Sequence, residues 1–167
     1  MTCRERLERL LGEHGVKYQV TPHRLAYTAQ EVATVEHVSG YDVAKVVMAA
    51  VDDRLIMLVL PAAYRVDLER VRRGLGASTA RLAREEEFAR LFPDCDLGAM
   101  PPFGNLYGIP VYVDRSLTRD PEIVFNAGSH RETMTLAYAD FERLVRPEVI
   151  EFVADSATPR VGVRQAV

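Results

Sequence analysis

The chain has 167 residues, of which 48% are hydrophobic and 27% are charged. This is the composition of a folded globular domain, and it excludes a chain that is disordered throughout. The 21 basic and 24 acidic residues give a net charge of −3. That balance excludes a protein held to nucleic acid by bulk positive charge, but not one with a local basic patch.

The first ten residues are charged throughout and lack the apolar segment of a signal peptide. The longest strongly apolar run, residues 55–63, contains Pro61 and is shorter than the roughly 20 residues that a membrane-spanning helix needs. We therefore expect a cytoplasmic protein with no membrane partner. Cys3 and Cys95 match no metal or redox motif, so we expect both to be reduced thiols.

Helical spacing, strand alternation and turn residues predict the elements in chain order. Thr2 to Glu5 and Thr28 to Glu31 both have the spacing of a helix-capping box. The first half of the chain predicts a helix that starts at Thr2 and is ended by Gly12 and Gly15, a strand over 18–20 broken at 21–23, a helix over 28–35, and a hairpin of strands 43–51 and 55–60. A helix that starts at Asp67 and is ended by Gly74 and Gly76 follows, then a helix over 84–92 and an irregular loop over 96–105. The last predicted elements are strands over 110–114, 122–126 and 132–138, a helix from Asp140 to Arg146, and a strand or helix over 149–153.

Hairpins outnumber βαβ units in this order, which indicates an α+β fold with a mixed, largely antiparallel sheet. No repeat and no linker divides the chain. We therefore expect a single domain over 1–153, followed by a frayed or disordered tail over 154–167.

Lys45 is the first candidate for chemistry. Strand alternation places it on an apolar face with Val43, Val47, Ala49 and Val51. Only two of the 21 basic residues are lysines, and a lysine, unlike an arginine, can lose its proton when buried. The structural alternative is an edge-strand lysine that prevents aggregation or reaches out to water. Motifs of serine hydrolases, nucleotide-binding loops and zinc sites are absent, so we expect no cofactor and no metal.

Two loops are further candidates. The loop from Gly98 to Gly104 holds Gly98, Ala99, Met100, Pro101 and Pro102, a composition that suits backbone N–H groups directed at an oxyanion or phosphate. The turn over 126–130 is small and polar and follows a predicted strand. A plain connecting loop and a hairpin corner are the respective structural alternatives.

These features occur in the order of a known family. The segments 43–45, 60–62, 98–104, 110–114 and 125–128 together resemble the YbaK/prolyl-tRNA-synthetase-associated domain family over about residues 16–153. That family contains free-standing trans-editing aminoacyl-tRNA deacylases and the insertion domain of bacterial prolyl-tRNA synthetases. The resemblance implies a curled mixed sheet surrounded by helices, and hydrolysis of the ester that joins a wrong amino acid to tRNA.

The resemblance also implies roles for single residues. Lys45 falls on the family's essential lysine, and Gly98 to Pro102 falls on its oxyanion and substrate-binding loop. The turn Gly128, Ser129 and His130 falls near its pocket. Val46 belongs to the same pocket and replaces a polar residue of the alanine-specific editors, which leaves the edited amino acid open.

The implied partner is aminoacyl-tRNA, with an aminoacyl-tRNA synthetase as a second candidate. Residues 65–84 contain six arginines against two acidic residues, which is a local charge of +4. We therefore expect Arg65, Arg72 and Arg73 to contact tRNA phosphates, the alternative being a solvated helix surface.

Two other functions fit the same residues. One is a non-catalytic module that binds an aminoacyl or nucleotide-like ligand on this fold, and the other is an esterase for small acyl groups. An intact Lys45 and an intact glycine-proline loop favour the deacylase.

Overall fold

The structure is a computed structural model that describes residues 1–23 and 43–154. The expected helix over 28–35 and residues 155–167 of the expected tail lie outside this part of the chain. The named helices and strands are α1 (Cys3–Glu13), β1 (Tyr18–Pro22), β2 (Ala44–Val51), β3 (Arg54–Pro61), α3 (Leu68–Gly74), β4 (Ala80–Leu82), α4 (Glu85–Phe88), β5 (Val111–Asp114), β6 (Glu122–Asn126), β7 (Glu132–Ala137), α5 (Tyr138–Val145) and β8 (Glu148–Ile150).

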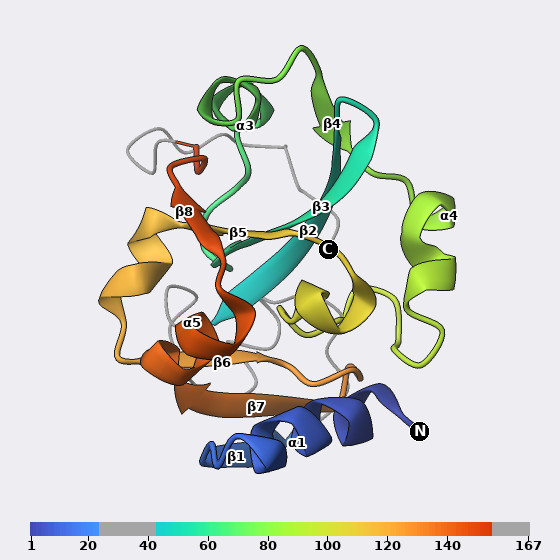
Figure 1. The fold of residues 1–167 in the computed structure, drawn as a ribbon, viewed down its shortest axis with the longest axis vertical. Helices are drawn as coiled ribbons and strands as arrows, with labels where there is room; N and C mark the ends of the chain where they lie inside the picture. Colours follow the sequence, from blue (N-terminus) through green and yellow to red (C-terminus); the bar gives the residue numbers. More distant parts are fainter. Residues whose placement is uncertain (24–42, 155–167) are drawn as a thin grey trace.

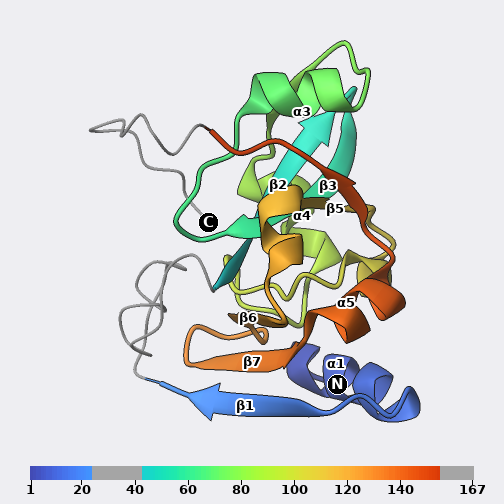
Figure 2. The same ribbon diagram turned by 90° about the vertical axis from the view of Figure 1, so that its left-hand side faces the viewer.

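The strands form two sheets, which confirms the α+β class. Strands β1, β7 and β6 make an antiparallel three-stranded sheet, and the order β4-β2-β3-β5-β8 makes a mixed five-stranded sheet. Strand β5 runs parallel to both β3 and β8. A parallel bridge between Val43 and Val124 links the two sheets. Helix α1 lies beside the smaller sheet, whereas α3 lies at the opposite end of the molecule (Figures 1 and 2).

The predicted hairpin of β2 and β3 forms the centre of the larger sheet. Asp52 and Asp53 both have positive φ, as a tight two-residue hairpin turn requires. All eight residues of β2 are buried because both faces of the strand are covered. Val46 and Met48 pack into a core shared with α1, α5 and the smaller sheet, while Val47 and Ala49 pack into a second core with α3.

The first helix follows its sequence signal closely. The Thr2 hydroxyl accepts a hydrogen bond from the Glu5 N–H at 3.1 Å, and the Glu5 carboxylate accepts one from the Thr2 N–H at 2.8 Å. Leu7 and Leu11 are fully buried one turn apart. None of the helices in residues 1–23 and 43–154 is long and apolar enough to cross a membrane.

Several elements differ from the sequence prediction. Strand β1 continues through Pro22, which pairs with Glu132, because β1 is a sheet edge where a missing N–H is tolerated. The helix expected over 84–92 divides into α4 and a 3₁₀ turn over 89–91. Strand β4 has only three residues and was not predicted. Helix α5 begins at Tyr138, so Asp140 lies in its first turn and does not cap it.

The expectation of reduced cysteines is wrong for this structure. Cys3 and Cys95 form a disulfide with their Cα atoms 5.2 Å apart. The bond joins the start of α1 to the segment that leads into Gly98, and the Cys3 N–H also donates to the Asp94 carbonyl at 3.1 Å. Because the partners are 92 positions apart, their spacing in the sequence carried no signal for the pairing.

The end of the described chain is fixed to the larger sheet. The buried Asp114 carboxylate accepts hydrogen bonds from the Phe152 N–H at 2.8 Å and from the Ser116 N–H at 3.0 Å. The Ala154 N–H donates to the Arg65 carbonyl at 2.8 Å, just before α3. This C-terminal segment therefore lies against the residues that precede α3.

Candidate active site

Lys45 is a buried cation with no counter-ion among the described residues. Its side chain is only 8% exposed, and it forms no hydrogen bond or ion pair with the residues that the structure describes. Burial, and then the charge of nearby Arg65, lower the pKa of Lys45 to about 8. The ammonium group is thus mostly protonated at neutral pH, and an anionic ligand would relieve the cost of burying it.

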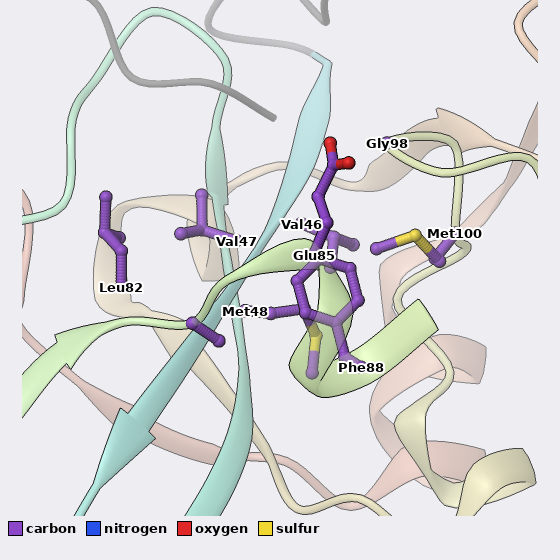
Figure 3. Close-up of a pocket in the computed structure, with 9 residues that line it drawn as sticks. Val46, Val47, Met48, Leu82, Glu85, Phe88, Gly98 and Met100 are labelled. Atoms are coloured by element: carbon purple, nitrogen blue, oxygen red, sulfur yellow. The ribbon is translucent and has the colours of Figure 1, made fainter. Parts of the chain in front are cut away.

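A cavity of about 150 Å³ opens beside the residues that follow Lys45 (Figure 3). Strand β4 pairs only with residues 49–51 of β2, which leaves the first half of that edge of β2 facing other elements. The cavity is lined by Val46, Val47, Met48, Leu82, Ala83, Glu85, Phe88, Gly98 and Met100. It therefore brings the predicted pocket residue Val46 together with two residues of the predicted loop. Lys45 does not line this cavity, and strand alternation places its side chain on the face of Val47.

The loop from Gly98 to Pro102 offers two backbone donors. Its prolines, Pro101 and Pro102, have no N–H, and the Ala99 N–H already donates to the Asp96 carbonyl at 3.0 Å. The N–H groups of Gly98 and Met100 find no acceptor among residues 1–23 and 43–154. Met100 is buried, and a buried N–H without an acceptor is rare in proteins. Within the described part of the chain, Gly98 and Met100 are thus the donors that this predicted loop can offer to a ligand, and Ala99 is not.

The predicted pocket turn is bonded directly to this loop. The Gly128 N–H donates to the Ala99 carbonyl at 2.9 Å, and the Asp96 N–H donates to the Gly128 carbonyl at 2.9 Å. The His130 Nε2 atom lies 2.8 Å from the Leu97 carbonyl, so this nitrogen carries the proton in that hydrogen bond. These bonds position the loop, although Gly128 and Ser129 line a separate cavity of about 470 Å³ beside the start of α1.

The arginine-rich segment is less cationic than its sequence suggested. Arg72 and Arg73 share one carboxylate, that of Glu69, with the Arg72 Nε atom 2.9 Å from it and the Arg73 Nε atom 3.7 Å. Arg81 forms two hydrogen bonds to Glu87 at 2.7 and 2.8 Å. The charge of +4 omitted the acidic residues just after residue 84, which pair with arginines at the end of the segment. Arg65 differs from the others because its charge reaches Lys45.

Two polar residues near the site had no individual role assigned to them from the sequence. Asn126 is 9% exposed, and its Oδ1 atom has no hydrogen-bond partner among the residues that the structure describes. The bridge between Val43 and Val124 is parallel, so Asn126 falls beside Lys45 in the same register. Glu85 is the second, and the sequence predicted it only as part of the helix over 84–92. Asn126 lay in the predicted turn over 126–130 and Glu85 in a predicted helix, but only the packing of strands and helices shows where these two side chains lie.

Comparison with known proteins places the chain in a family. Residues 23–144 match the aminoacyl-tRNA editing domain. This chain belongs to the aminoacyl-tRNA editing domain family. The match confirms the family predicted from the segments around Lys45, Gly98 and Phe125.

Individual relatives agree with this assignment. The chain is 28% identical over 153 residues to the multifunctional Ser/Thr-tRNA deacylase ProXp-y of Escherichia coli strain K12, covering 89% of this chain and 91% of the relative. The hypothetical protein APE2540 has the same fold, with a TM-score of 0.80 at 18% identity over 89% of this chain and 99% of that one. A protein proposed to be a trans-editing enzyme for prolyl tRNA synthetase gives a TM-score of 0.77 at 22% identity over 93% of this chain and 99% of that one.

Proposed function

We propose that this protein hydrolyses the ester bond of mischarged aminoacyl-tRNA, acting in trans on the free substrate. The observation that carries the proposal is the match of residues 23–144 to the aminoacyl-tRNA editing domain. The named activity of the relative ProXp-y supports the same reaction. The site we assign to it consists of Lys45 and the loop from Gly98 to Pro102.

Lys45 binds the phosphate of the terminal nucleotide in this proposal. An aminoacyl-tRNA end carries its full negative charges on phosphates, and a buried ammonium without a counter-ion suits such an anion. Asn126 Oδ1 accepts a hydrogen bond from a ribose hydroxyl, which would satisfy an acceptor that is otherwise buried without a donor. Together these contacts hold the ester in place beside the loop.

The hydrolysis step then requires little more than correct positioning of the ester. An aminoacyl ester is already activated, so a water molecule can attack it without a protein nucleophile. The tetrahedral intermediate carries its negative charge on the former carbonyl oxygen. In our proposal the N–H groups of Met100 and Gly98 donate to that oxygen, because they have no acceptor among the described residues.

The cavity beside Val46 receives the amino-acid side chain. Its volume of about 150 Å³ and its walls of Val46, Met48, Phe88 and Met100 suit small side chains. An apolar wall rejects an added hydroxyl group only weakly, so seryl and threonyl esters should enter as readily as alanyl and valyl esters. The named substrates of ProXp-y fit this expectation.

The direct test is deacylation of a panel of alanyl-, seryl-, threonyl-, valyl- and phenylalanyl-tRNA. We expect hydrolysis of one or more of the small esters above the spontaneous rate, and little hydrolysis of the phenylalanyl ester. Lys45→Ala should lower kcat/KM by at least about 100-fold, and Lys45→Arg should fail as well because guanidinium differs in shape and hydration. Lys17→Ala is the matched control, since Lys17 is the other lysine of the chain and is exposed.

Two results would contradict the proposal. Hydrolysis of no ester in the panel would remove the deacylase function. Activity of a folded Lys45→Ala variant at the wild-type rate would keep the function but remove Lys45 from the site.

A further inference from the structure

Three consecutive glutamates at the start of α4 differ in what they contact. Glu86 pairs with Arg84 at 3.1 Å, and Glu87 accepts two hydrogen bonds from Arg81. The Glu85 carboxylate forms no hydrogen bond or ion pair with the residues that the structure describes. It lines the cavity beside Val46, whereas its two neighbours do not. The unpaired carboxylate is therefore the one that faces a candidate binding site.

Glu85 is the charged residue in an otherwise uncharged lining. The remaining lining residues are apolar or glycine. In Figure 3 the Glu85 side chain extends beyond the Phe88 ring and carries its carboxylate toward the side where Gly98 lies. An incoming molecule would thus meet apolar walls inside the cavity and one negative charge at its margin.

That combination matches the chemistry of an aminoacyl group. Its Cα atom carries a side chain and, one bond away, an ammonium group with a positive charge. The site that we propose also holds Lys45, whose positive charge would repel this ammonium. A carboxylate at the cavity offsets the repulsion and supplies a charge-assisted hydrogen bond.

We propose that Glu85 binds the α-ammonium group of the aminoacyl ester. This inference rests on the proposed deacylase function and deepens it. The amino-acid side chain then enters the cavity, and the ester carbonyl faces the loop that holds Gly98 and Met100. The consequence is selection by the amino group: the site accepts a free aminoacyl ester and disfavours an ester whose nitrogen is acylated, as in a peptidyl-tRNA.

The experiment compares two esters that differ only at the α-nitrogen. Seryl-tRNA and N-acetylseryl-tRNA have the same tRNA, side chain and ester bond, but the acetylated nitrogen has no charge. If the panel above shows a different preferred amino acid, that pair is used instead. The enzymes are wild type, Glu85→Gln and the matched control Glu86→Gln, whose residue is paired and lies outside the cavity lining.

We expect wild type to hydrolyse the free aminoacyl ester about tenfold or more faster, in kcat/KM, than the acetylated ester. Glu85→Gln should lose about tenfold on the free ester and keep the wild-type rate on the acetylated ester, so that the preference disappears. Glu86→Gln should match wild type on both. Thermal unfolding should be unchanged in Glu85→Gln, because this side chain is exposed.

Each other outcome overturns the inference in a recognisable way. Equal losses on both esters would show that Glu85 acts as a general base or a structural residue. No loss on either would show that Glu85 does not contact the substrate. A wild-type protein inactive on both esters and on the whole panel would instead remove the proposed function itself.

Discussion

Replacing Lys45 with methionine should stabilise the fold while it abolishes the proposed activity. The pKa of Lys45 falls from 10.5 to about 8, mainly because the ammonium is buried. The charged form is therefore disfavoured in the folded state relative to the unfolded state. A difference of this size corresponds to about 3 kcal/mol, and Lys45→Met should raise the free energy of unfolding at neutral pH by about that amount.

The stability difference between wild type and Lys45→Met should also change with pH, and the direction of the change can be worked out. Between pH 8 and pH 10.5 the unfolded chain keeps the lysine proton and the folded protein loses it, so the stability of wild type rises with pH in this window. Lys45→Met has no such proton. The stability gap between the two proteins should therefore narrow by about 2 kcal/mol from pH 7 to pH 9.5.

Urea denaturation followed by circular dichroism at both pH values measures the gap. Lys17→Met is the control for the replacement of a lysine by methionine, because Lys17 is exposed. A Lys45→Met protein less stable than wild type at pH 7, or a gap that is constant with pH, would refute the view that Lys45 is a buried cation with no counter-ion among the described residues.

Three further predictions follow from contacts elsewhere in the fold. Reversing the charge of Arg72 and Arg73 should weaken tRNA binding and reduce the log–log salt slope by about 1.5, and an unchanged slope would place the RNA on another face. Gly128→Ala should lower the free energy of unfolding by about 1–3 kcal/mol, because a Cβ atom there would lie 2.7 Å from the Cys3 Cβ and φ is +98°. An unchanged urea midpoint would contradict this close packing. Cys95→Ser should destabilise the protein by up to about 4 kcal/mol because it opens a long covalent loop, and two titratable thiols in the native wild-type protein would disprove the disulfide.

Local patterns in the sequence were enough to predict most of the framework. Alternation and a two-residue polar turn defined the hairpin of β2 and β3, and the capping box defined α1, because those signals act between near neighbours. Lys45 stood out for the same reason, since one polar residue interrupts an apolar face. The class of fold followed from the order of these elements, and the family followed from the resemblance carried by segments such as 43–45, 98–104 and 125–128.

What the sequence could not provide depends on contacts between distant segments. Cys3 meets Cys95 only because α1 docks beside the segment before Gly98. The Ala99 N–H is unavailable to a substrate because it bonds to Asp96, and no composition rule reveals that choice. Glu85 resembles its two neighbours in sequence and differs from them only in facing a cavity rather than an arginine.

The contacts of the last described residues limit how far the chain can be shortened. The family match stops at residue 144, yet β8 and the C-terminal segment lie beyond it. A protein cut at residue 144 would lose the Phe152 N–H and leave the buried Asp114 carboxylate with one fewer donor. It would also free the backbone before α3, where the Ala154 N–H holds Arg65 in place next to Lys45. Any fragment made for binding or kinetic work should therefore extend at least to residue 154.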